Sequence, residues 1–171
     1  PPRASGRRAI RTLVVLAMAL ALLVPTGLAL ADRLRAVDRS SDAAMADWLA
    51  EQGVSLVVCA GYMHLLQPVF LERFPQSVVN VHPALLPSFP GVDAPRQAFE
   101  HGVKITGATV YFIDAGLDAG AIIAQEAVPV LPGDDDGLLA ARILAAEHRL
   151  YPATIARLLT GGWSVAGRRL S

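Results

Sequence analysis

The chain has 171 residues, of which 53% are apolar, so it can bury one hydrophobic core, and a single domain is the default expectation. Its 15 basic and 15 acidic residues give a formal net charge of zero. This balance argues against nucleic acid as the main partner, because a surface that binds phosphates needs an excess of cations. The single cysteine, Cys59, lies in an apolar run and predicts a buried strand thiol. We expect no disulfide and no metal site.

The beginning of the chain differs in character from the rest. Four arginines precede an apolar run over residues 13–24, and small residues follow it. This pattern is typical of a secretory signal peptide or a membrane anchor, and an aberrant start is the alternative. We therefore predict an apolar, signal-like or aberrant segment over residues 1–37 and a folded domain over residues 38–171.

Hydrophobic periodicity predicts alternating helices and strands after this segment. We predict helices over residues 38–52, 66–74, 96–100 and 134–159, and strands over residues 54–60, 78–82, 106–113 and 122–130. The longest helix begins at three aspartates, which face the positive end of the helix dipole. Strands that alternate with helices predict an α/β fold with a largely parallel sheet and flanking helices.

Three polar residues lie where the predicted strands end. Asn80 and His82 are two residues apart on one strand, so both side chains point to the same side. Asp118 follows the next strand, and if that strand is parallel, all three residues lie at the carboxyl ends, where open α/β sheets bind ligands. An amide and an imidazolium can hold a developing oxyanion, and a carboxylate keeps the imidazole charged. The trio predicts direct acyl transfer, and a structural histidine is the alternative.

Four blocks of the sequence resemble the signature of the folate-dependent formyltransferases, in the order and at the spacing of that family. They are residues 60–66 (AGYMHLL), 80–91 (NVHPALLPSFPG), 106–111 (TGATVY) and 114–120 (DAGLDAG). The resemblance implies a Rossmann-like fold, a catalytic domain over residues 38–171 and a cytoplasmic location. It also implies a cis peptide bond between Leu86 and Pro87.

Within this family, the branch that formylates glycinamide ribonucleotide in de novo purine biosynthesis is the most similar. Its members take the formyl group from 10-formyltetrahydrofolate, which serves as a co-substrate, and need no metal. By resemblance, His82 would be the general acid and Asn80 would donate its amide to the tetrahedral oxyanion of the bound substrate. Asp118 would keep the histidine protonated and order a water for proton transfer.

The resemblance also assigns binding residues. The folate would contact two segments, mainly through backbone groups: Met63, His64, Leu65 and Leu66, and Ala115, Gly116, Leu117, Asp118, Ala119 and Gly120. Glu147, on the long helix, would contact the ribonucleotide, and a solvated helix residue is the alternative. His64 stands where the family commonly has arginine, and His101 and His148 are expected at the surface.

The sequence departs from this family near its start. The family's first strand is followed by a glycine- and serine-rich loop that holds the substrate phosphate. Nothing in residues 1–39 matches that loop, and residues 13–16 are at most a first strand. We therefore expect an N-terminally incomplete formyltransferase of doubtful activity. The alternatives are methionyl-tRNA formyltransferase, formyltetrahydrofolate deformylase, a non-catalytic folate-binding fragment and an exported protein. The oligomeric state is not predicted.

Overall fold

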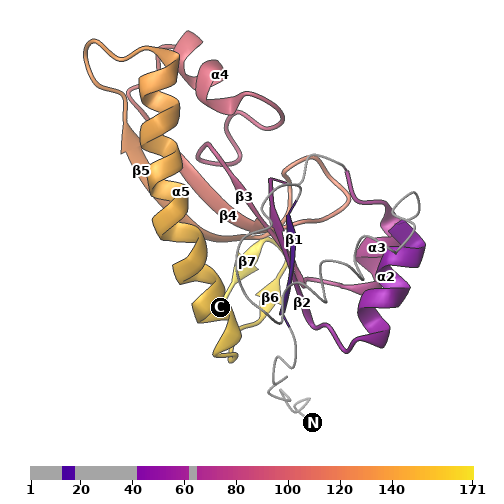
Figure 1. Cartoon of the computed structure of the whole chain (residues 1–171). Helices are drawn as coiled ribbons and strands as arrows, with labels where there is room; N and C mark the ends of the chain where they lie inside the picture. Colours follow the sequence, from indigo (N-terminus) through magenta and orange to yellow (C-terminus); the bar gives the residue numbers. More distant parts are fainter. Residues whose placement is uncertain (1–12, 18–41, 62–64) are drawn as a thin grey trace, which may run out of the picture. The chain divides into compact units, whose positions relative to one another are not determined.

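The computed structural model describes residues 13–17, 42–61 and 65–171 of the chain (Figure 1). The chain divides into two compact units, which separate between Val78 and Val79. No helix in the described ranges is long and apolar enough to cross a membrane. The predicted boundary at residue 37 falls outside these ranges and stays a prediction.

The unit before Val79 contains two parallel strands. Strand β1 (Leu13–Ala17) pairs with strand β2 (Leu56–Ala60), and Leu13 lies opposite Leu56. The first part of the apolar N-terminal run is therefore a strand. This agrees with the first-strand alternative of the sequence analysis. The backbone N–H of Val57 donates to the carbonyl of Ser77 at 2.8 Å, which ties β2 to the segment that leads into the next strand.

Two helices pack against each other in this unit. They are α2 (Asp42–Glu51) and α3 (Pro68–Arg73). The Asp42 carboxylate accepts a hydrogen bond from the backbone of Gln67 at 2.5 Å, so it joins the start of one helix to the start of the other. Phe70 is fully buried. The helices predicted here are confirmed, with shorter bounds than expected.

The thiol of Cys59 lies in the core of this unit. Every residue of β2 up to Cys59 is buried, as expected for a strand that is covered on both faces. Burial raises the pKa of this thiol to about 12, because the thiolate would lose its hydration. The prediction of a buried strand thiol is confirmed.

The unit after Val78 is built on a second group of strands. Strand β3 (Val78–His82) lies beside β4 (Ile105–Phe112), which lies beside β5 (Ile122–Pro129). Two short strands, β7 (Arg169–Leu170) and β6 (Val165–Ala166), follow β5 in that order. They were not predicted, because two-residue strands carry no measurable periodicity.

The α/β class is confirmed, but the strands are not largely parallel in this unit. Strand β4 runs antiparallel to both β3 and β5, so the sheet is mixed. The connection between β4 and β5, residues 113–121, is too short for the crossover that a parallel pair requires. The alternation of strands and helices therefore misled the prediction of direction, while it located the strands correctly.

The long helix α5 (Asp136–Leu159) covers one face of these strands (Figure 1). Its apolar side packs on β4 and β5 and forms a buried cluster of Ala108, Val128, Leu139, Ile143 and Ala146. Because side chains alternate along a strand, Thr109 and Tyr111 of β4 point away from α5. Helix α4 (Ala94–Glu100) also contacts α5.

The predicted start of the long helix is confirmed. The side chain of Asp135 caps it by accepting a hydrogen bond from the backbone of Leu138 at 2.7 Å. Both carboxylate oxygens of Asp134 accept from the guanidinium of Arg142 at 2.7 Å. This pairing lowers the pKa of Asp134 to about 2. Asp134 is therefore an ion-pair partner, Asp135 is the cap, and Asp136 is the first helical residue.

The hydroxyl of Thr106 gives the first testable prediction. Thr106 lies on the α5 side of β4, and its Oγ1 is buried with no hydrogen-bond partner among the described residues. We expect Thr106→Val to raise the free energy of unfolding by about 1 kcal/mol, because it removes an unpaired buried polar group at nearly constant volume. Urea unfolding measures this change. A loss of stability greater than about 1 kcal/mol would show that the hydroxyl has a partner, such as a buried water.

Candidate active site

The face of the strands opposite α5 carries a set of polar side chains. In the antiparallel register, Asn80 of β3 lies opposite Tyr111 of β4, and His82 lies opposite Thr109. Thr109 in turn lies opposite Gln125 of β5. Residues that are directly opposite each other share a face of the sheet. The predicted pair Asn80 and His82 therefore belongs to a larger polar surface that extends over three strands.

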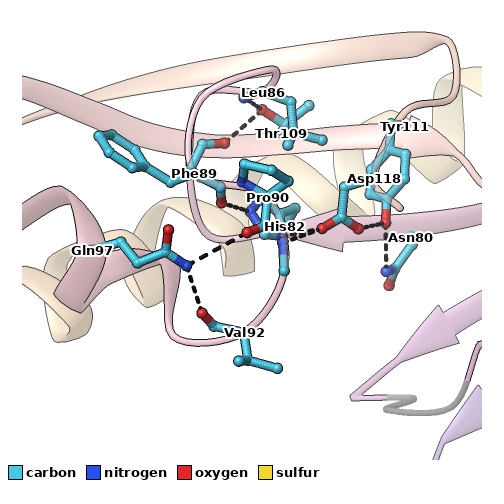
Figure 2. A network of polar contacts seen from close by, with 12 residues as sticks. Asn80, His82, Leu86, Phe89, Pro90, Val92, Gln97, Thr109, Tyr111 and Asp118 are labelled. Atoms are coloured by element: carbon cyan, nitrogen blue, oxygen red, sulfur yellow. Dashed lines mark hydrogen bonds and ion pairs between the residues drawn. The ribbon is translucent and has the colours of Figure 1, made fainter. Parts of the chain in front are cut away.

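The three predicted catalytic residues come together through Tyr111 (Figure 2). The Tyr111 hydroxyl donates to Asp118 Oδ1 at 2.5 Å and accepts from Asn80 Nδ2 at 3.1 Å. The other carboxylate oxygen of Asp118 lies 3.5 Å from His82 Nδ1. Only 6% of the His82 side chain and 12% of the Asp118 side chain are exposed. The predicted convergence of Asn80, His82 and Asp118 is confirmed.

The route that brings Asp118 to the site differs from the predicted one. Because β4 is antiparallel to β3, its carboxyl end lies beside Val79, away from His82. The loop over residues 113–121 closes at its base, where the backbone N–H of Phe112 donates to Ala121 at 2.9 Å. A Cβ at Gly120 would lie 1.7 Å from the Phe112 carbonyl, so the closure needs glycine. Asp118 thus reaches His82 through loop folding, and the argument from carboxyl ends was wrong.

The proline-rich turn after β3 supplies backbone groups to the same network. His82 Nε2 lies 2.7 Å from the carbonyl oxygen of Phe89, and the N–H of Gly91 donates to Asp118 Oδ2 at 2.7 Å. Both ring nitrogens of His82 therefore face oxygen acceptors. Only the imidazolium form, in which both nitrogens carry protons, can donate to both.

A side-chain clamp holds the start of this turn. Thr109 Oγ1 donates to the Ala84 carbonyl at 2.6 Å and accepts from the Leu86 N–H at 3.0 Å. Gln125 Nε2 donates to Thr109 Oγ1 and to the Leu86 carbonyl, both at 2.9 Å. The hydroxyl thus uses its one donor and both acceptor positions. The bond between Leu86 and Pro87 is cis, as predicted.

Helix α4 holds the end of the turn. Gln97 Nε2 donates to the carbonyl of Val92 at 2.7 Å, a contact that Figure 2 shows beside the network. His101, at the end of this helix, is exposed as expected, and its ring centroid lies 5.3 Å from that of Phe89. The turn is therefore held from β4, β5 and α4 before it meets His82 and Asp118.

The predicted folate-binding residues differ in their burial, and two of them are not described by the structure. Met63 and His64 lie outside the described residues. In the unit before Val79, Leu65 is 79% exposed and Leu66 is buried. In the other unit, Ala115, Gly116 and Leu117 are exposed, Ala119 is half-buried, and Gly120 is buried. Their role in binding stays a prediction.

Glu147 lies on α5 and is half-buried. Tyr151, one turn further along the helix, donates its hydroxyl to the carbonyl of Val79 at 2.9 Å. Burial raises the pKa of Glu147 to about 7, because its carboxylate loses hydration. The role of Glu147 as a substrate contact stays a prediction. His148 is exposed, as expected.

The sequence analysis missed Thr109, Tyr111 and Gln125 as site residues. A signal existed for the first two, because polar Thr109 and Tyr111 alternate with apolar Ala108 and Val110 along one strand. Such alternation indicates a strand with one polar face. The described residues contain no group of three or more His, Cys, Asp or Glu side chains that could hold a metal ion.

Comparisons with known proteins agree on one family. The family model described as formyl transferase matches residues 12–155. The chain is 50% identical over 127 residues to phosphoribosylglycinamide formyltransferase of Mycobacterium tuberculosis (strain ATCC 25618 / H37Rv). That match covers 74% of this chain and 59% of the relative.

Solved structures give the same result. Glycinamide ribonucleotide transformylase 1 from Symbiobacterium toebii has a TM-score of 0.73 and 51% identity, over 78% of this chain and 63% of that one. A formyltetrahydrofolate deformylase from Pseudomonas syringae pv. tomato has a TM-score of 0.72 and 28% identity, over 77% and 44%. The chain thus spans about 60% of the length of the two more similar relatives.

The Thr109 clamp gives a prediction about stability. We expect Thr109→Val to lower the free energy of unfolding by about 2–4 kcal/mol, because it leaves buried groups at Ala84 and Leu86 without their partner. Thr109→Ser keeps the hydroxyl and should cost about 1 kcal/mol for the lost methyl group. Urea unfolding followed by tryptophan fluorescence compares the two variants. Equal losses would show that the hydroxyl contributes nothing to the turn.

Glu147 gives a prediction about pH. Its pKa rises from 4.5 to about 7 on folding, so its contribution to stability is fully present below pH 4.5 and is lost as the pH rises to about 7. Glu147→Gln removes this loss. We expect the variant to be more stable than the original chain at pH 8, by on the order of 1–2 kcal/mol after allowance for partial exposure, and equally stable at pH 4.

Thermal or urea unfolding at both pH values measures the difference. Exposed Glu100, which pairs with Arg96 on the surface of α4, provides the control. Glu100→Gln should change stability little and by a similar amount at pH 4 and pH 8. The same stability difference for Glu147→Gln at both pH values would mean that this carboxyl group is well hydrated in the folded chain.

Proposed function

The chain belongs to the formyl transferase family, and from this premise we propose that it carries the catalytic residues of a phosphoribosylglycinamide formyltransferase. The reaction moves the formyl group of 10-formyltetrahydrofolate to the amine of glycinamide ribonucleotide. The observation that carries the proposal is the convergence of Asn80, His82 and Asp118 on one hydrogen-bonded network. Identity of 50% to a relative of that name supports the choice of substrate.

The first step forms a carbon–nitrogen bond. The amine of glycinamide ribonucleotide attacks the formyl carbon, and the carbonyl oxygen becomes a tetrahedral oxyanion. Asn80 has two N–H groups on Nδ2, of which one donates to Tyr111. The second donates to the oxyanion, whose charge grows only in the transition state, so this hydrogen bond lowers the barrier.

The second step breaks the bond between the formyl carbon and N10 of the folate. His82 acts as the general acid and protonates N10, while a water ordered by Asp118 takes the proton that the attacking amine loses. The proton on His82 Nε2 is held at 2.7 Å by the Phe89 carbonyl, whereas Nδ1 lies 3.5 Å from Asp118. We assign the transferred proton to Nδ1, because its contact with Asp118 is long and holds this proton more weakly than the Phe89 carbonyl holds the proton on Nε2.

Binding of the substrates uses other parts of this unit. The loop from Ala115 to Gly120 contacts the folate through backbone groups, and Glu147 contacts the ribonucleotide. The raised pKa of Glu147, about 7, leaves this carboxyl group able to donate as well as accept a hydrogen bond near neutral pH. A cytoplasmic location follows from this role in purine biosynthesis.

The comparison with the deformylase favours an amine acceptor over water. The deformylase has almost the same TM-score as the transformylase, but its identity to this chain is 28% against 51%. The backbone likeness therefore supports both reactions, and the likeness of the side chains supports transfer to glycinamide ribonucleotide.

The proposal predicts that this chain binds the formyl donor but has little or no turnover. The chain contains residues 115–120, to which we assign folate contacts, so we expect measurable affinity for a non-reactive 10-formyltetrahydrofolate analogue. The sequence over residues 1–39 contains no phosphate-binding loop of the family type. Charge-assisted hydrogen bonds contribute about 1.5–3 kcal/mol each, and about 1.4 kcal/mol is a factor of ten in affinity. We therefore expect little or no turnover of glycinamide ribonucleotide.

Calorimetry with the analogue and a formyl-transfer assay on the same preparation test both parts. A folded chain that does not bind the analogue would contradict the proposed function. Turnover at a rate ordinary for enzymes, about 10 per second, would show that residues 1–39 supply a phosphate site of another kind. His82→Gln should retain binding of the analogue and abolish any residual transfer, which separates chemistry from binding.

A further inference from the structure

The hydroxyl of Tyr111 has its hydrogen-bonding roles fixed by its two neighbours. It lies 2.5 Å from Asp118 Oδ1, and an ionised carboxylate can only accept. The single hydroxyl proton must therefore point at Asp118. The hydroxyl then has only lone pairs to offer Asn80, so Asn80 must turn its Nδ2, and not its Oδ1, toward Tyr111. The charge on Asp118 thus sets the orientation of an amide on another strand.

We propose that Tyr111 is a positioning residue that locks the Asn80 amide in the orientation that formyl transfer needs. In this orientation, the second N–H of Nδ2 is available to a developing oxyanion. In the flipped orientation, an oxygen would occupy that place and repel the oxyanion. The link to transfer rests on the proposed function, whereas the lock on the amide is a property of the chain alone.

The surroundings of Tyr111 make it suited to this role. It is 3% exposed and stands directly opposite Asn80 in the register of β3 and β4. Figure 2 shows its hydroxyl between the amide and the carboxylate. The ring is buried, so it should keep its position when only the hydroxyl is removed. Tyr111→Phe therefore removes two hydrogen bonds with little change in volume.

The composition of the chain allows a direct test. Asn80 is the only asparagine in the sequence, so labelling asparagine side chains with ¹⁵N gives one NH₂ group in a two-dimensional NMR spectrum. In the original chain, we expect one of the two amide protons to exchange slowly with solvent. In Tyr111→Phe, we expect that proton to exchange at least about tenfold faster, because its acceptor is gone.

Two further variants control the result. Thr106→Val removes a hydroxyl from the same strand on the face toward α5, and it should leave the exchange of both protons unchanged within about twofold. Asp118→Ala removes the carboxylate that directs the hydroxyl and keeps Asn80 as the only asparagine, and it should also speed the exchange of the protected proton. Tyr111→Phe can be checked for folding by the exchange of its backbone amides.

The outcomes separate this inference from the proposed function. If the Asn80 protons exchange at the same rate in Tyr111→Phe and in the original chain, the lock does not exist, and Tyr111 only fills space. If the lock exists but the original chain does not bind the formyl folate analogue, the proposed function fails and the structural inference stands. If both hold, Tyr111→Phe should keep its affinity for the analogue within about twofold.

Discussion

The Asp118 carboxylate joins three parts of the chain that are separate in the sequence. One oxygen accepts from Tyr111 on β4, and the other accepts from the backbone of Gly91 in the proline-rich turn and faces His82 on β3. Asp118 itself sits in the left-handed region of the backbone, at φ 49°, a conformation that aspartate adopts more readily than most residues. One buried negative charge thus holds the imidazole, the turn and the tyrosine hydroxyl together, and these groups in turn stabilise the charge.

Strand β4 serves two purposes because its two faces are chemically different. Toward α5 it presents small and apolar side chains such as Ala108, which let the long helix pack closely. On the other face it presents Thr109 and Tyr111, whose hydroxyls are fully engaged by the turn and by the Asp118 network. Packing of the apolar face against α5 makes the strand rigid. The side chains on the polar face are therefore held within hydrogen-bond distance of their partners. Precision of this kind is what a preorganised site requires.

Much of this could be read from the sequence, and the parts that could not have clear physical reasons. The strand over residues 78–82 and the long helix were located from periodicity, and the trio of Asn80, His82 and Asp118 from their positions and their family resemblance. Strand direction was misjudged, because an alternation of helices and strands says nothing about how a short connection such as residues 113–121 must turn. The alternation along β4 could have placed Tyr111 on a polar face, but its pairing with Asn80 depends on a cross-strand register that no local pattern reveals. The contact of the Phe89 carbonyl with His82 could not be predicted for a different reason. Every residue has a backbone carbonyl, so the sequence does not mark the one that is used.

The use of main-chain groups in this site determines which changes it tolerates. Two of the groups that meet His82 and Asp118 are the carbonyl of residue 89 and the N–H of residue 91, and both belong to the main chain. A replacement of the Phe89 side chain would leave its carbonyl in place. The insertion or deletion of one residue between Pro83 and Gly91 would move both groups out of reach. For position 89, the length of the turn is therefore a stricter constraint than the identity of the side chain.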